Sequence, residues 1–564
     1  MHARALWHGR PRRLPMSGPR RHALLLVLHG IALGGALPVP IPAQEPAKAP
    51  PSFAELEAAD ARIGEIRVRT ADVFDAQDPR EDHALFRWAN ALHIQTRASV
   101  IESALLFKRG DRVSVAVIDE TERLLRSARY LYDVQIRSLA FHDGVVDIDV
   151  LTRDTWSLLP ALGATRAGGA NSSGIRLREY NLLGTGTTLG IGHSTNVDRS
   201  SNELLISNER AFGTWTALRF SLARNSDGRR DAVSIVRPFH ALDSRWAAGI
   251  TASKDSRIDA VYNAGNVVSE YRHRQNKAEV FGGWSQGRVE GWVQRYSIGV
   301  SLLDDAFAPE PGRTAPAALP TDEKLVGPFL RYEIIEEHYE KLQNRNMIGS
   351  PEFFALGFAS TLQVGWATTG LGSSHNALVY EASVSRGSEP APAHTLLASA
   401  SISGQYRDGQ VRKQRFGVQG QYHLPQSKRW LLYVSASGDM LTRPDVLETL
   451  RLGGDNGLRG YPLRYQGGDK RVLFALEERV FTDRYVWRLF RVGGAAFVDA
   501  GRAWGGPHVN AANPGWLADA GFGLRIASVR TAFNDVLHVD IAVPFNATPD
   551  IKKVQLLVKG KASF

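Results

Sequence analysis

Several short patterns in the chain carry side chains of the kinds used in catalysis, but none forms a known catalytic motif. Gly192-His193-Ser194 resembles part of a nucleophile elbow, yet Asn196 stands where that motif has glycine, and the segment alternates like a strand. The 16 histidines include no His-Glu-x-x-His pair, and the absence of cysteine excludes thiolate chemistry. We therefore predict no enzyme activity, no metal and no cofactor, although a Ser/His/acid site assembled from distant strands stays open.

A different kind of chemistry is indicated by the segment Gly457-Leu458-Arg459-Gly460-Tyr461. A partly desolvated guanidinium needs a bidentate carboxylate to offset its lost hydration. The glycines on either side of Arg459 would let the backbone pass close to a wall of other residues. The pattern predicts a packed loop whose arginine forms an ion pair, with a surface loop and a solvated arginine as the alternative.

The positive charge of the chain is concentrated at its N-terminus. Residues 1–43 contain six arginines and no lysine or acidic residue, so they account for 6 of the formal charge of +10 and leave +4. Arg20 and Arg21 precede the apolar stretch 23–28, an order typical of a secretory signal peptide that starts at Met1 or Met16. A buried N-terminal helix is the alternative. We predict a signal peptide over 1–43, a Pro/Ala-rich linker over 44–59, and no nucleic-acid partner.

The segment 60–160 is predicted to form a small α+β domain. Residues 63–74 alternate in part and predict a strand, and Ser99 with Glu102 fits a capping box that opens a short helix through Phe107. A second helix is predicted from 115 to 130, with Val117, Thr121, Leu124, Leu125 and Ala128 on its apolar face and Glu120 on its polar face. Strands 133–138 and 145–151 then meet at Asp143-Gly144, a pair that suits a hairpin turn.

From 161 to 564 the sequence predicts strands throughout. Stretches of alternating apolar and polar residues are separated by Gly, Asn, Asp and Ser turns, and they continue for some 400 residues without a helical period. Tryptophans recur near strand ends, at Trp246, Trp284, Trp366, Trp430 and Trp504, as an interfacial girdle requires. We predict a transmembrane antiparallel β-barrel with an even number of strands. A mean hydropathy of −0.22 fits this prediction, because half of each strand faces water.

The number of strands follows from counting the alternating stretches. A direct tally gives about 20 strands, with long loops at about 303–324 and 442–470. The segment 254–277 fits no strand, one strand or a hairpin.

The alternation also predicts which side chains face the inside of the barrel. If Val498 and Ala500 face lipid, then Asp499 faces the lumen, and the same parity places Glu477 and Arg525 there. A loop arginine inside that lumen would pair with these carboxylates, and Asp499 is the preferred partner.

Motifs that occur in order between 180 and 564 resemble those of the BamA/TamA superfamily of outer-membrane proteins. Leu458-Arg459-Gly460-Tyr461 resembles the signature of its lumen loop, and the segments 497–501 (FVDAG) and 521–525 (GFGLR) resemble two of its strands. The segment 179–186 (EYNLLGTG) resembles its first hairpin, and the chain ends on Phe564, as a barrel-insertion signal should. The resemblance implies 16 strands and a loop folded back into the lumen.

The β-α-α-β-β order of 60–160 resembles a POTRA domain, the periplasmic module of the same superfamily; an unrelated α+β domain is the alternative. The matching residues are Gly110-Asp111, Leu124-Leu125 and the segment 130–134 (YLYDV). The resemblance implies a bacterial outer-membrane location with this domain in the periplasm. One such unit, in place of the multi-unit arrays of the central assembly factors, suggests an accessory member.

The implied partners are the outer-membrane bilayer, unfolded outer-membrane or secreted client proteins, and accessory periplasmic subunits. The implied function is insertion or assembly of outer-membrane proteins, or protein translocation across that membrane. The alternative is a transporter dedicated to one secreted partner, or a passive pore.

Overall fold

The computed structural model describes residues 50–506, 515–528, 536–549 and 551–561. The signal peptide predicted over 1–43 and the terminal Phe564 lie outside these residues. The described residues form a small α+β domain and a closed β-barrel. None of their helices has the length and apolar character needed to cross a membrane.

The α+β domain is a three-stranded sheet covered by short helices, in the strand order β1-β3-β2 with β1 parallel to β3. Residues that are almost fully buried, among them Ile101, Leu125 and Val134, pack its helices onto the sheet. Both Asp143 and Gly144 have positive φ, as the predicted hairpin turn between β2 and β3 requires. The elements are α1 Phe53–Ala58, β1 Arg62–Ala71, α2 Ala84–Leu92, α3 Ala98–Glu102, α4 Val115–Arg126, β2 Leu131–His142 and β3 Val145–Asp154.

The structure of this domain departs from the predictions at three helices. Helix α1 lies inside the segment predicted as a linker, where Ser52 and Glu55 form a capping box. Helix α3 is shorter than predicted, and its N-cap position is Arg97 rather than Ser99, because the Arg97 N–H bonds the carbonyl of Gly184, which fixes the chain two residues earlier. Helix α2 was not predicted at all.

Glu120 lies on α4 but is buried, contrary to the predicted polar face. Its carboxylate accepts a hydrogen bond from the Leu242 N–H at 2.8 Å and an ion pair from Arg288 at 3.1 Å. Leu242 lies in the connection between β9 and β10, and Arg288 lies near the end of β11. Both are far along the chain, so the helical period alone could not show that this face would be covered.

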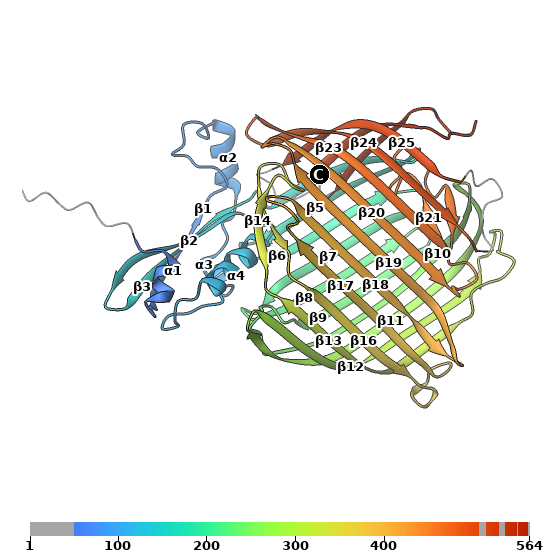
Figure 1. Cartoon of the computed structure of the whole chain (residues 1–564), viewed down its shortest axis with the longest axis horizontal. Coiled ribbons are helices and arrows are strands. Elements are labelled where there is room, and N and C mark those ends of the chain that lie inside the picture. The colour runs from blue at the N-terminus through green and yellow to red at the C-terminus, as the bar shows by residue number, and fades with distance from the viewer. Residues whose placement is uncertain (1–49, 507–514, 529–535, 550, 562–564) are drawn as a thin grey trace, which may run out of the picture. The chain divides into compact units, whose positions relative to one another are not determined.

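The predicted barrel is confirmed, and within the described residues it closes with 20 antiparallel strands, the number given by the tally and not the 16 implied by the resemblance. Figure 1 shows these strands as a tilted, closed wall. The uncertain segment 254–277 is a hairpin of two long strands. The strands are β4 Leu158–Ala167, β5 Ala170–Leu182, β6 Thr187–Thr195, β7 Ser200–Ala211, β8 Thr216–Asn225, β9 Gly228–Arg237, β10 Trp246–Asn263, β11 Asn266–Val289, β12 Trp292–Pro309, β13 Glu323–Glu336, β16 Ala359–Ala367, β17 Ala377–Ser388, β18 Thr395–Arg407, β19 Gln410–Pro425, β20 Trp430–Thr442, β23 Lys470–Val486, β24 Phe490–Trp504, β25 Leu517–Ser528, β26 Val536–Pro544 and β27 Gln555–Lys561.

The barrel begins at Leu158, three residues before the predicted boundary. The segment 179–186 therefore spans the end of β5 and the turn into β6, and it is not the first hairpin, which is β4–β5. We call the end of the barrel where β4 starts the entry end and the opposite end the far end. Because the strands alternate in direction, the connection 443–469 lies at the far end and the connection 337–358 at the entry end.

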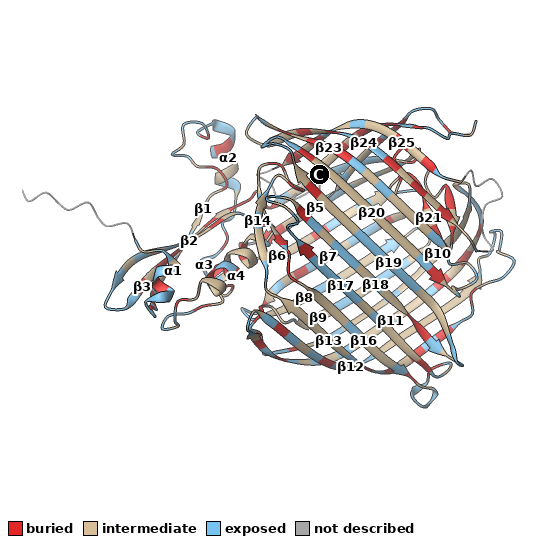
Figure 2. Cartoon of the chain, viewed as in Figure 1, coloured by how far each residue is buried: buried red, intermediate tan, exposed pale blue. Residues whose placement is uncertain are grey.

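The exposed outer face is apolar, as the alternation predicted. Val498, Phe522 and Ile541 are 44%, 64% and 40% exposed, and they alternate with buried residues of the inner face. Trp246 and Trp284 face each other across β10 and β11, and both are about half exposed. Figure 2 shows that buried residues concentrate on β23 to β25, whereas β17 to β19 are mostly intermediate or exposed.

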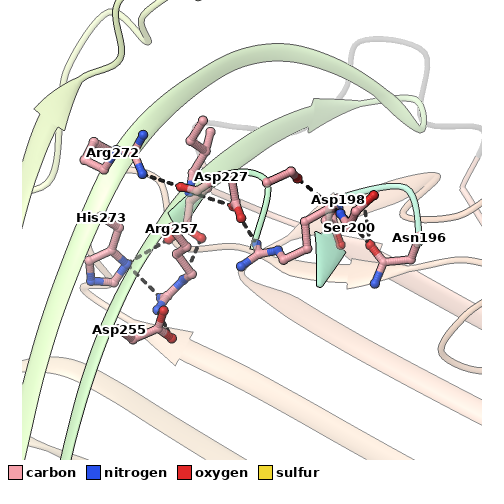
Figure 3. A network of polar contacts seen from close by, with 12 residues as sticks. Asn196, Asp198, Ser200, Asp227, Asp255, Arg257, Arg272 and His273 are labelled. Carbon is pink, nitrogen blue, oxygen red and sulfur yellow. Dashed lines mark hydrogen bonds and ion pairs between the residues drawn. The ribbon is translucent and has the colours of Figure 1, made fainter. Parts of the chain in front are cut away.

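Strands β10, β11 and β12 have 18, 24 and 18 residues, more than the roughly 9–11 that a tilted strand needs to cross a bilayer. A polar network joins them at the far end (Figure 3). Arg257 pairs with Asp255 at 3.0 Å and with Asp259 at 2.8 Å, and His273 contacts Asp305 at 3.0 Å. The network supports a three-stranded extension of the wall beyond the length needed to span a membrane. Strand β12 continues to Pro309, so the loop predicted at 303–324 starts later, after Pro309.

Candidate functional site

The long connection 443–469 folds back into the barrel lumen. It contains the short strands β21 (Leu450–Leu452) and β22 (Gln466–Gly468), which pair with each other. Leu458 and Tyr461 are fully buried in one apolar cluster with Ala503 of β24 and Leu517 of β25. Both wall residues lie on the face opposite the exposed Val498 and Phe522, so the loop packs against the inner face of the barrel.

Arg459 forms a buried ion-pair cluster with this wall. Its Nε and Nη2 donate to the two carboxylate oxygens of Asp499 at 2.6 and 2.7 Å, a bidentate pair, and its Nη1 lies 2.8 Å from Glu477. The side chain of Arg459 is 6% exposed and that of Asp499 is 0% exposed. The guanidinium also lies 3.4 Å from the ring centre of Phe497, two residues before Asp499 on the same face. Both predicted acidic partners therefore contact the arginine.

The two glycines of the segment are required by close approach. A Cβ added at Gly460 would lie 2.7 Å from the Cβ of Asp519 on β25, and one added at Gly457 would lie 2.2 Å from Leu473 on β23. Gly457 also has a φ of +137°. Larger residues at either position would push the loop away from the wall and separate Arg459 from its carboxylates.

Arg525 lies in the lumen, as predicted from its parity, but it does not contact Arg459. It is fully buried and pairs with Asp540 of β26, whose other carboxylate oxygen lies 3.7 Å from Arg459. Asp540 thus joins the two arginines. Asp540 is buried on the inner face of β26, where it alternates with the exposed Ile541. In the register of β25 and β26, Arg525 lies opposite His538, and Gly523 lies opposite Asp540. Arg525 therefore reaches Asp540 diagonally, at the neighbouring position on the same face.

The same connection is attached to the turn between β6 and β7. Arg464 donates to both carboxylate oxygens of Asp198 at 2.8 and 2.7 Å, and Tyr262 donates its hydroxyl to Asp198 at 2.9 Å. Arg464 and Arg451 both lie over the ring of Tyr262, at 4.5 and 4.7 Å. The connection therefore crosses the lumen from β23–β25 to the turn after β6.

This attachment should weaken in acid. The hydrogen bonds from Arg464 hold the pKa of Asp198 below its ordinary value, against the opposing effect of desolvation. A carboxylate whose pKa is lower in the folded state contributes stability above its unfolded pKa of about 3.9, and loses it as the pH falls through the folded pKa. We expect hydrogen exchange of 443–469, corrected for its intrinsic pH dependence, to be constant from pH 5 to 8 and to accelerate below about pH 4. In the Asp198→Asn variant, 443–469 should exchange fast at every pH. An acceleration below about pH 4 that persists in this variant would contradict the assignment of the acid step to Asp198.

A second segment enters the lumen from the entry end. The connection 337–358 forms a hairpin of β14 (Tyr339–Gln343) and β15 (Pro351–Ala355), and we call it the strap. Its Ile348 is 1% exposed and packs in a cluster with Leu431, Phe481, Ala495, Ala527 and Val536, residues of the inner face of β20 and β23–β26. Arg479 of β23 donates to the carbonyl of Arg345 at 2.9 Å. The strap was not predicted, because the residues that cover it come from strands far along the chain.

Replacing Ile348 with aspartate should release the strap. A carboxylate in this apolar cluster has no partner, and burying an unpaired charge costs about 3 kcal/mol or more. The chain has no cysteine, so Met347→Cys gives a single reporter thiol. We expect its maleimide labelling to accelerate at least roughly tenfold in the Ile348→Asp background, since each 1.4 kcal/mol is a factor of ten. Ala355→Asp, at an exposed strap position, is the control and should leave the rate unchanged.

The barrel closes through a weak seam. Strand β27 pairs with β4 through one residue pair, Val558 with Arg166, within the described residues. By contrast, β26 and β27 share a register of seven pairs, from Val536–Lys561 to Ala542–Gln555. Along the described residues of β27, the other backbone N–H and C=O groups that face β4 therefore lack ladder partners, and such groups are costly in hydrocarbon.

The structure does not assemble the catalytic pattern considered above. His193 and Ser194 are neighbours on β6, so their side chains point to opposite faces of the wall, and His193 contacts Asn202 at 2.9 Å. Among the described residues there is no group of three or more His, Asp or Glu side chains suited to a metal ion.

No protein-family model and no curated protein matches the sequence. Solved structures do match. BamA from Haemophilus ducreyi, lacking POTRA domains 1–3, is 14% identical over 88% of this chain and 84% of that one, with a TM-score of 0.40. CdiB from Acinetobacter baumannii is 12% identical over 89% and 73% (TM-score 0.44), and CdiB from Escherichia coli is 12% identical over 89% and 76% (TM-score 0.46).

Proposed function

We propose that this chain is a BamA/TamA-type barrel of the bacterial outer membrane that moves polypeptides into or across that membrane. The observation that carries the proposal is the seam between β27 and β4. A strand edge with unpaired backbone groups cannot remain open to lipid, so it must be satisfied by another strand. A client strand that pairs there would be templated by the barrel and released into the bilayer.

The α+β domain supplies a second edge on the same principle. We propose that it is a POTRA-like periplasmic domain and that β2, one of the two edge strands of its sheet, binds clients by strand addition. Tyr132, Leu139 and Phe141 on β2 are 36–37% exposed, and they would give an added strand apolar contacts. Accessory periplasmic subunits are further candidates for this edge.

The competing function is transport of one dedicated secreted partner, and a passive pore is the third. Two segments inside the lumen, the connection 443–469 and the strap, oppose the passive pore. Depletion of the protein followed by quantitative proteomics of the outer membrane and the medium separates the other two. Loss of many barrel proteins from the outer membrane supports assembly, whereas loss of a single secreted protein supports the dedicated transporter.

A further inference from the structure

The inner face of β5 to β9 carries a group of arginines that the ion-pair cluster of Arg459 does not use. We call Arg176, Arg178, Arg219 and Arg230 the arginine arc. They lie on β5, β8 and β9, and Glu203 of β7 is interspersed with them. The arc thus has more positive than negative charge.

The cross-strand register places the arc inside the barrel. Arg219 is opposite Ser207 on one side and Ser234 on the other, whereas the next residue, Phe220, is opposite Val233. Phe220 and Val233 are 41% and 42% exposed and belong to the apolar outer face. Because successive side chains of a strand point to opposite faces, Arg219 faces the lumen.

The neighbouring strand β6 is built to let two of these arginines lie across it. Arg176 is opposite Gly192 and Arg178 is opposite Gly190. A Cβ added at Gly192 would lie 3.3 Å from the Cγ of Arg176, and one added at Gly190 would lie 3.2 Å from the Nε of Arg178. The arginine side chains therefore lie over the two glycine positions, where any larger side chain would meet them.

The arc lines an open part of the lumen. A cavity of about 680 Å³ is lined by Arg178, Arg219 and Arg230 with serines between them, and a second of about 850 Å³ toward the entry end shares Arg178 and Arg219. Within the part of the chain that the structure describes, Arg176, Arg219 and Arg230 have no hydrogen-bond or ion-pair partner. The opposite wall, from β20 to β26, is covered by the strap and by 443–469.

We propose that the arginine arc binds acidic, extended segments of polypeptides that pass through the lumen. This inference rests on the proposed function and names its substrate class. Arg176 and Arg178 are two residues apart on one strand, so their side chains repeat at about 6.8 Å, as do alternate carboxylates of an extended acidic chain. The inward position of the arc favours a polypeptide over the headgroup of an anionic lipid, which would reach the outer face.

Binding is tested on the purified full chain in detergent with a fluorescein-labelled peptide of alternating Asp and Ser, using fluorescence anisotropy. We expect the wild type to bind this peptide and not its Lys-Ser counterpart. The variant R176Q/R219Q/R230Q should raise the Kd at least roughly tenfold, and added salt should weaken wild-type binding, since screening shortens charge interactions. The matched control R224Q/R229Q/R274Q removes three arginines from the outer-face parity of β8, β9 and β11, and it should bind like the wild type.

The position of the bound peptide is tested without changing any arginine. Because the chain has no native cysteine, Ser221→Cys places one thiol on the inner face beside Arg219, and Phe220→Cys places one on the outer face. A bromoacetyl Asp-Ser peptide should alkylate Ser221→Cys and spare Phe220→Cys.

Equal alkylation of the two cysteine variants, or unchanged peptide affinity in the folded triple variant, would overturn the proposal. So would a triple variant that loses binding of lipopolysaccharide micelles but keeps the peptide, because that result would identify a lipid-headgroup site. The outcome is independent of the depletion experiment. A protein whose depletion leaves the outer membrane intact can still bind the acidic peptide, and the reverse also holds.

Discussion

Replacing Arg459 with alanine is expected to destabilise the folded barrel by about 3–5 kcal/mol, the cost of breaking a buried ion pair from one side. The substitution leaves Asp499, which is fully buried, and Glu477 without the guanidinium that bridges them. It also removes the contact with the Phe497 ring. The change is measured as the urea midpoint at which the fast-migrating folded band on unheated gels is replaced by the slow-migrating unfolded band, and as protease cleavage within 443–469.

Two further variants separate the ion pair from general loss of the side chain. Arg459→Lys keeps the charge but not the planar fork, so it cannot bond both oxygens of Asp499 while reaching Glu477, and it should lie between wild type and alanine. In the double variant Arg459→Ala/Asp499→Ala the second change should cost less than it does alone, with a coupling of about 0.5–3 kcal/mol. Arg464→Ala, which breaks the half-buried pair with Asp198 and the contact with the Tyr262 ring, is the control and should have the smaller effect.

An Arg459→Ala protein with the wild-type urea midpoint and an equally protected loop would show that the cluster does not hold 443–469 in place. The loop would then be held by its apolar cluster around Leu458 and Tyr461. The double-variant cycle distinguishes these cases, because a coupling near zero excludes the ion pair as the source of stability even where both single variants are unstable.

The partners of Arg459 could be predicted because strand alternation is a local property. A period of two fixes the face of Asp499 from its neighbours Val498 and Ala500, with no knowledge of which strands are adjacent. The pairing of Arg525 with Asp540 needs the register between β25 and β26, and that register depends on turn and packing geometry. Local patterning therefore identified which side chains face the lumen, but not which of them pair with each other between neighbouring strands.

The missed elements have the same physical origin. The strap is stabilised by Ile348 against five strands that follow it in the chain, and no feature of 337–358 alone indicates that contact. Ser99 and Glu102 satisfy the capping-box spacing, but Arg97 is already bonded to Gly184 in the turn before β6, and this tertiary contact sets the helix start. Both cases are decided by long-range contacts that override local propensity.

A disulfide across the seam is expected to discriminate insertion from transport through the lumen. Val558 and Arg166 are direct antiparallel partners, so cysteines at these positions would have Cα atoms about 4.5–5.5 Å apart, within the span of about 4.4–6.8 Å that a disulfide bridges. The chain contributes no other thiol. Oxidation of the Arg166→Cys/Val558→Cys variant should therefore join β4 to β27 and hold the seam shut.

If clients add their strands at the seam, the oxidised variant should lose nearly all activity, and a reductant should restore it, because the block is one covalent bond between two strand edges. If clients instead pass through the lumen, closing the seam leaves their path open, and the oxidised and reduced proteins should support equal transport. The control is Ala164→Cys/Ser173→Cys, a lipid-facing pair in the fully paired hairpin β4–β5. Its disulfide joins strands that are already held by ten register pairs, so it should leave both activities unchanged. Inhibition by the control bond as well would show that rigidity of β4, and not opening of the seam, limits the reaction.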